Sequence, residues 1–173
     1  MGRLARLPAE TRELVELAAC VGNTIDAKTL AAIAALDRAS LEGRLLPAFE
    51  QGLLILGQGS YRFAHDRVRQ AAYSLMPEAE RPSIHLRVGR LLLETTPPDK
   101  LDARVFVLVN QLNRGAALIT DPAEQVNVAR LNLCAGRKAR NSAAPAAAVQ
   151  YLRTAILLLG EDGFTTAYDV AYP

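Results

Sequence analysis

The feature that most constrains the fold is a short strand-like stretch, residues 53–64, which lies between segments with helical periodicity. It consists of two apolar segments, LLIL and YRFA, separated by the turn sequence GQGS. Two such segments joined by a few residues that include glycine are typical of a β-hairpin, because glycine adopts the positive φ angles that these turns need. We therefore expect one hairpin in a chain that is otherwise helical.

Three helices are predicted ahead of this hairpin. The first begins at Pro8, the second covers residues 28–36 with Asp26 as its N-cap, and the third covers residues 40–50. Proline is favoured in the first turn of a helix, and an aspartate N-cap accepts hydrogen bonds from backbone N–H groups that lack a helical partner. Three helices followed by a hairpin is the element order of a winged-helix domain, which we predict for residues 1–76.

After Met76 only helical periodicity remains, and we expect antiparallel helical hairpins in a chain that is mainly α. The segment AAAVQYLRTAILLLG, residues 146–160, has an apolar face wide enough to pack against two neighbouring helices. It is similar to the second helix of a tetratricopeptide repeat. A new amphipathic segment begins at Thr165 and stops with the sequence. We therefore predict a tetratricopeptide-like region over residues 77–173, truncated at its C-terminal end, in a piece of a longer protein.

The charge balance limits the class of partner. The 173 residues include 20 Lys and Arg against 18 Asp and Glu, a net charge of +2. Nucleic acids are bound by clustered, unpaired cations, so we do not expect a nucleic-acid partner. Cys20 and Cys134 lie far apart, as in proteins of a reducing compartment. The sequence has no apolar core of a signal peptide and no uncharged run of the roughly 18 residues that a membrane helix needs. We expect a soluble cytoplasmic protein without membrane contact.

Motifs for catalysis and metal binding are missing from the sequence. It contains no GxSxG, HExxH, GxxxxGK[ST] or GxGxxG motif. The two histidines, His65 and His85, are 20 positions apart, and neither has a neighbour at the spacing of metal ligands. We therefore expect no catalytic residue and no metal in this chain, and we do not expect it to be an enzyme by itself.

The pair His65–Asp66 lies where the hairpin ends and the next helical segment begins. In the first turn of a helix, the Asp66 carboxylate would accept free backbone N–H groups and would be stabilised by the helix dipole. His65 would then be a packed core histidine with one hydrogen bond. From the residues alone, this structural interpretation of the pair is favoured over a ligand-binding one.

The order of a winged helix, a His-Asp pair and helical repeats resembles the signal-transduction ATPases called STAND or NB-ARC-like. The resemblance implies that the winged helix follows a nucleotide-binding domain and that its His-Asp pair closes over the bound nucleotide. The family's histidine contacts the ADP phosphate and helps to hold the closed, inactive state. His65 and Asp66 match that pair, with Phe63 and Ala64 before them.

Several longer segments are similar to one bacterial group of very large sensor kinases, and together they cover nearly the whole chain. They are LPAETRELVELAACVGNTID, YRFAHDRVRQAAYSLMPE, IHLRVGRLLLETTP, VNQLNRGAALI, LNLCAGRKARNSAA and AVQYLRTAILLLGEDGF. Such proteins carry a serine/threonine-kinase-like domain, an AAA-type STAND ATPase, a helical region, GAF or PAS sensors and often a histidine kinase of two-component signalling. The family's P-loop and Walker B segments are absent here and would lie upstream. The resemblance therefore implies that ATP or ADP is held by an upstream domain, with no cofactor in this chain.

The resemblance implies a non-catalytic regulatory role. The chain would couple the nucleotide state of an upstream ATPase domain to downstream sensor or kinase domains, with His65 and Asp66 sensing that state. The helical repeats would offer a surface to a protein partner. Two alternatives stay open: a scaffold for protein interactions in which the His-Asp pair only caps a helix, and part of a STAND-type transcriptional regulator.

Overall fold

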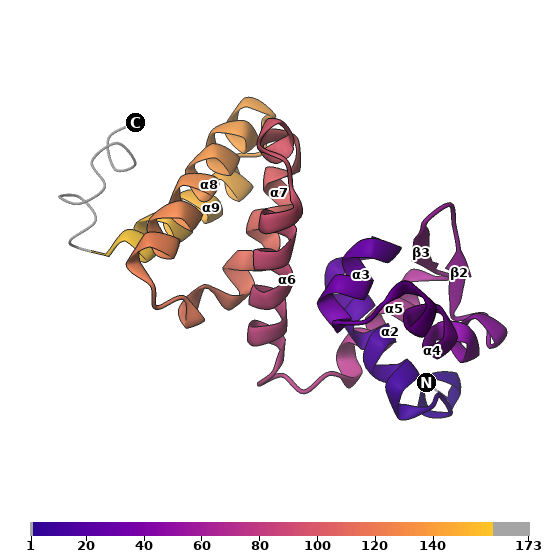
Figure 1. Ribbon diagram of the computed structural model, residues 1–173. Helices are drawn as coiled ribbons and strands as arrows, with labels where there is room; N and C mark the ends of the chain where they lie inside the picture. The colour runs from indigo at the N-terminus through magenta and orange to yellow at the C-terminus, as the bar shows by residue number, and fades with distance from the viewer. Residues whose placement is uncertain (1, 161–173) are drawn as a thin grey trace. The chain divides into compact units, whose positions relative to one another are not determined.

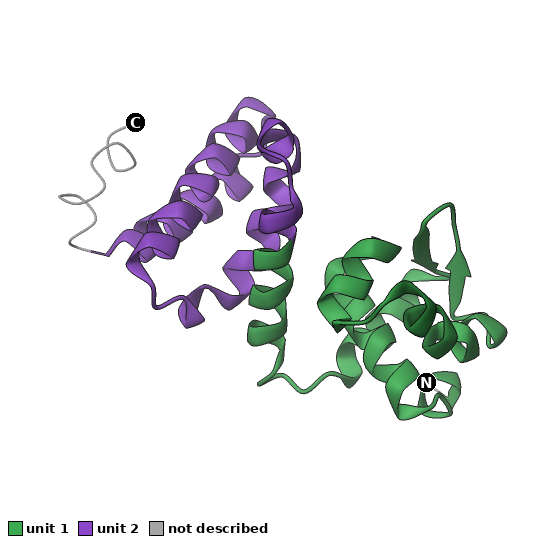
Figure 2. Cartoon of the chain, viewed as in Figure 1, with its two compact units in different colours: residues 1–91 green, residues 92–173 purple. Residues whose placement is uncertain are grey.

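The structure is a computed structural model of the chain and describes residues 2–160. The protein is mainly helical and carries one small antiparallel sheet (Figure 1). It divides into two compact units, residues 1–91 and residues 92–173 (Figure 2). The predicted domain boundary between residues 76 and 77 lies in the loop between α5 and α6, whereas the two units meet within α6. The domain boundaries stay a prediction.

The elements follow one another in a simple order. In the first unit they are α1 (Gly2–Ala5), α2 (Ala9–Val21), β1 (Thr24–Asp26), α3 (Ala27–Ala34), α4 (Arg38–Glu50), β2 (Leu54–Leu56), β3 (Ser60–Phe63) and α5 (Asp66–Leu75). Helix α6 (Arg81–Thr95) contains residues of both units. The second unit continues with the short 3₁₀ helix η1 (Pro98–Lys100), α7 (Leu101–Leu112), the 3₁₀ helix η2 (Asn113–Leu118), α8 (Pro122–Asn141) and α9 (Pro145–Leu159).

The predicted hairpin is confirmed, and it belongs to a sheet of three strands. β2 pairs antiparallel with β3, with Leu54 opposite Phe63, and the turn contains Gly59 at a φ of +74°. β1 was not predicted from the sequence. It pairs with the other edge of β3, with Ile25 opposite Tyr61, so the strand order is β1-β3-β2. Three residues are too few for an alternating pattern to show, and Asp26 is also the N-cap of α3.

The three helices predicted before the hairpin are present as α2, α3 and α4, and aspartates begin two of them. Asp26 accepts a hydrogen bond from the Thr29 N–H at 2.7 Å, and Asp37 accepts one from the Ser40 N–H at 2.9 Å. The four-residue helix α1 was not predicted. It is held in place by its own Leu4 and by the following Leu7, both of which are buried.

The core of the first unit lies between α2, α4, α5 and the sheet. Its fully buried large side chains include Val15, Leu30, Leu41, Leu45, Tyr61 and Phe63. In α5 the periodicity predicts Val68, Ala72 and Leu75 on the inner face, but Leu75 is 44% exposed. Met76, one residue past the end of the helix, is buried instead and lies 3.5 Å from the Cys20 sulfur.

The second unit is built from helices alone. α8 and α9 are joined by residues 142–144 and pack along one another. The Asp121 carboxylate caps α8 by accepting hydrogen bonds from the backbone N–H groups of Ala123 and Glu124. A buried cluster joins α7 and α8 through Val105, Val109 and Ala135.

One face of α9 differs from the prediction. Of its apolar residues, Ala148, Ala155 and Leu158 are buried, as expected for a helix packed on a neighbour. Of the other residues of the predicted wide face, Val149, Leu152 and Ile156 are exposed, whereas Tyr151 and Leu159 are half-buried. The neighbouring Leu157, which was not assigned to that face, is 80% exposed. The amphipathic segment predicted from Thr165 lies outside the residues that the structure describes. No helix within residues 2–160 is both long enough and apolar enough to cross a membrane.

Candidate functional site

The candidate site begins where β3 passes into α5. His65 is the N-cap of α5, with extended backbone angles of φ −145° and ψ 146°. Its carbonyl oxygen accepts the first helical hydrogen bond from the Val68 N–H at 2.9 Å. The His65 side chain makes no capping hydrogen bond and is exposed. The expectation of a packed core histidine is therefore wrong for His65, because its side chain is exposed.

Asp66 lies in the first turn of α5, as predicted. Its contacts are not the expected backbone N–H groups. Oδ1 accepts a hydrogen bond from the Arg69 Nε at 2.9 Å, and Oδ2 accepts one from the Gln70 side-chain amide at 2.6 Å. Residues three and four positions along a helix lie on the same face, which explains why these two donors reach the carboxylate. Both carboxylate oxygens of Asp66 thus stabilise the start of the helix through hydrogen bonds. The His65 side chain makes no such bond.

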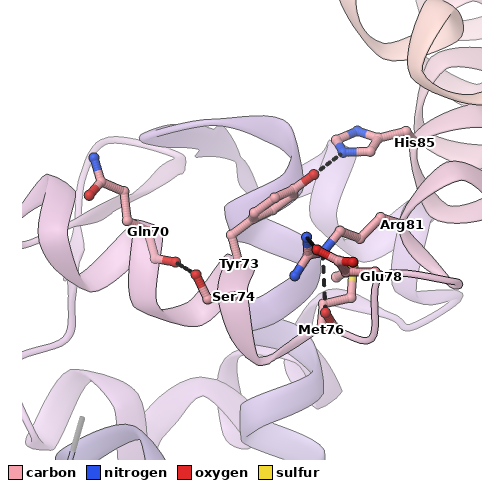
Figure 3. Close-up of polar contacts among 7 residues, drawn as sticks. All are labelled: Gln70, Tyr73, Ser74, Met76, Glu78, Arg81 and His85. Carbon is pink, nitrogen blue, oxygen red and sulfur yellow. Dashed lines mark hydrogen bonds and ion pairs between the residues drawn. The ribbon is translucent and has the colours of Figure 1, made fainter.

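A second polar cluster lies at the C-terminal end of the same helix (Figure 3). The Tyr73 hydroxyl and the Nε2 of His85 are 3.0 Å apart, and the two rings are tilted at a centroid distance of 5.8 Å. The Arg81 guanidinium lies 4.9 Å from the centre of the Tyr73 ring, in cation–π range. Arg81 also donates to the Met76 carbonyl at 3.2 Å and pairs with Glu78 at 3.3 Å.

This cluster connects α5 to α6 across the intervening loop. His85, on α6, is only 2% exposed, so it is the buried histidine of the chain's described part. The sequence did not point to this contact, because Tyr73 and His85 are 12 positions apart in separate helices and only the fold brings them together. This partly buried hydrogen bond, together with the contact between the two rings, restricts how α6 leaves α5.

In the second unit, Asp102 of α7 contacts Cys134 and Lys138 of α8. Cys134 donates to Asp102 at 3.5 Å, and burial raises the pKa of its thiol, with the Asp102 carboxylate raising it further. The Lys138 ammonium beside Asp102 lowers the pKa of that carboxyl group. A thiol with a raised pKa is a poor nucleophile. Within residues 2–160, no group of three His, Cys, Asp or Glu side chains is placed to hold a metal ion.

Comparison with known proteins relates the chain to a signal-transduction kinase. No protein family model and no solved structure matches the chain. The chain is similar to a hybrid signal transduction histidine kinase, kinase G of Dictyostelium discoideum, with 26% identity over 212 aligned residues. The match covers 91% of this chain but only 6% of that protein. The chain thus resembles a small part of a signal-transduction kinase, which supports a signalling role.

Proposed function

We propose that this chain is a non-catalytic regulatory region of a larger signal-transduction ATPase or protein kinase. It couples the nucleotide state of an upstream ATPase domain to downstream sensor and kinase domains of the same protein. The observation that carries the proposal is the exposed His65 at the start of α5, which makes no capping bond of its own. The similarity to a histidine kinase supports the signalling context.

The proposed architecture is a winged helix followed by tetratricopeptide-like helices. In favour of the first part, α2, α3 and α4 precede the β2–β3 hairpin, and β1 adds a third strand to it. In favour of the second part, α8 and α9 form a closely packed pair joined by a short connection. The STAND or AAA-type ATPase domain and the kinase, whether a histidine kinase or a serine/threonine kinase, would lie elsewhere in the longer protein.

His65 is suited to sense a phosphate that another domain holds. An exposed imidazole without a capping bond can turn to a nucleotide phosphate without breaking a hydrogen bond of its own. If it makes this contact only in the ADP-bound arrangement, it favours that arrangement by its differential contact energy, on the order of 1–3 kcal/mol. Asp66 keeps the start of α5 ordered through Arg69 and Gln70. ATP or ADP itself would be bound by the upstream domain.

α5 offers a direct route for passing this state onward. His65 precedes its first residue, and Tyr73 near its last turn contacts His85 of α6. A helix of this length moves as a rigid element, so a displacement at His65 changes the position of Tyr73. The contact of Tyr73 with the buried His85 then transfers the displacement to α6, which contains residues of both units.

The proposal is tested in a longer protein that contains this chain together with its ATPase and kinase domains. His65→Ala is expected to raise basal kinase activity several-fold, because the inactive arrangement loses a contact. Gln58→Ala, in the exposed β2–β3 turn, is the control and should leave basal activity unchanged. Equal basal activity in the two variants would contradict the proposal.

A protein-interaction scaffold is the second candidate, and the exposed apolar side chains of α9 favour it. Val149, Ile156 and Leu157 are each more than 40% exposed. In a scaffold, the His65–Asp66 pair would only begin a helix. The same experiment separates the two functions, because a scaffold predicts that His65→Ala leaves kinase activity unchanged.

A further inference from the structure

A pocket in the first unit combines a basic rim with apolar walls. Its volume is about 420 Å³, and it lies between the N-terminal segment, the residue before β2 and the first half of α5. The side chains that define its character are Arg3, Arg6, Arg67, Leu4, Leu53 and Val68. None of the described residues that line it is acidic.

The three arginines of this pocket are not neutralised by neighbouring carboxylates. Five other arginines of the same unit form ion pairs within 4.0 Å: Arg12, Arg38, Arg44, Arg69 and Arg81. Arg3, Arg6 and Arg67 form none among the described residues, and Arg3 instead donates to the Gln51 carbonyl at 3.2 Å. Asp66 precedes Arg67 in the sequence, but its two carboxylate oxygens accept hydrogen bonds from Arg69 and Gln70. The pocket therefore keeps three positive charges.

The backbone segments that carry these three arginines are held in place by buried side chains. On one side, Leu4 and Leu7 are 4% and 5% exposed and fix the N-terminal segment that carries Arg3 and Arg6. On the other side, Arg67 lies in the first turn of α5, whose inner face is packed on α2. Three arginines without a carboxylate in the lining therefore concentrate positive charge at this pocket.

We propose that this pocket binds a small organic phosphate. Guanidinium groups bind phosphate oxygens in bidentate geometry, and three of them match a group with two or more negative charges better than a single carboxylate. The volume lies within the roughly 300–1,000 Å³ range of small-molecule sites. Leu4, Leu53 and Val68 provide the apolar contact for the organic part of the ligand. This site goes beyond the proposed function, because it lies in this chain and does not involve His65.

The test is a calorimetric titration of the 173-residue chain with phenyl phosphate at low salt. We expect saturable binding that is tighter than the binding of inorganic phosphate, because the phenyl ring contacts the apolar wall. Arg67→Gln and Arg6→Gln should each weaken binding about tenfold, as expected for one lost charge-assisted hydrogen bond. Arg62→Gln removes the same charge from an exposed arginine outside the pocket and should leave affinity unchanged.

Three results would overturn the proposal. Phenyl phosphate could fail to bind at millimolar concentration, or Arg67→Gln and Arg6→Gln could bind it as well as Arg62→Gln does. A hexaglutamate peptide that binds more tightly than phenyl phosphate would point to an acidic protein surface instead. Circular dichroism verifies that each variant is folded. If Arg67→Gln does not fold, the binding of phenyl phosphate is compared with Arg6→Gln alone. His65→Ala is expected to leave this affinity unchanged, so the proposed function and this site fail independently.

Discussion

At the scale of single residues, two tyrosines of the first unit differ in whether their hydroxyl groups have a hydrogen-bond partner. Tyr61, on β3, is completely buried against Phe49, and its hydroxyl has no hydrogen-bond partner among the described residues. Burial also raises the pKa of this hydroxyl. Tyr73, in contrast, shares a 3.0 Å hydrogen bond with His85. A buried polar group without a partner destabilises a fold, whereas a partnered one contributes to stability.

We predict opposite effects for the two conservative substitutions. Tyr61→Phe removes an unsatisfied hydroxyl and should leave the free energy of unfolding unchanged or raise it by up to about 1 kcal/mol. Tyr73→Phe leaves the His85 nitrogen without this partner and should lower that free energy by about 1–2 kcal/mol. Urea denaturation of the two variants measures the difference. A larger loss of stability for Tyr61→Phe than for Tyr73→Phe would contradict this description of the core.

The two histidines also show which features of a residue can be predicted from the sequence and which cannot. The position of His65 at the start of α5 follows from a local change of periodicity, and it was predicted. Its exposure was not, because the direction of an N-cap side chain depends on backbone angles. His85 is buried by a contact with a residue of another helix, which no spacing in the sequence reveals.

At the scale of elements, features with local causes could be predicted from the sequence. The hairpin follows from its two apolar segments and turn, and α3 begins at the expected cap, Asp26. β1 could not be predicted, because its three residues form a strand only by pairing with β3. The apolar face of α9 was recognised, but periodicity does not say whether a partner is present to cover it.

The packing of α8 on α9 leads to a prediction at this scale. A Cβ atom on Gly136 would lie 2.9 Å from the Leu152 Cγ and Cδ2, so glycine permits the close approach of the two helices. Gly136→Val should lower the free energy of unfolding by about 1–3 kcal/mol through overpacking. Gly43→Val is the matched control, since a Cβ atom on this glycine of α4 meets nothing within 4 Å.

Thermal unfolding of both glycine variants provides the measurement. Both substitutions place a β-branched residue in a helix, so the difference between them isolates the contact with Leu152. Equal melting temperatures for Gly136→Val and Gly43→Val would contradict the prediction. They would show that α8 and α9 can move apart at Gly136 without a loss of stability.

At the scale of the whole molecule, the chain consists of two units that share the long helix α6. The first unit carries the exposed His65 at one end of α5 and the Tyr73–His85 contact at the other. In the proposed function, α5 receives a signal at its start and passes it to α6. The role of His65 in this account rests on a nucleotide bound by another domain.

The rate of ADP dissociation from the longer protein tests this central claim most directly. With a fluorescent ADP analogue bound to the upstream domain, His65→Ala should accelerate dissociation about tenfold, as expected for the loss of a coupling contact of typical strength. Gln58→Ala should dissociate at the rate of the unmodified protein. If His65→Ala and the unmodified protein release the analogue at the same rate, His65 does not sense the nucleotide, and the pair only marks the start of α5.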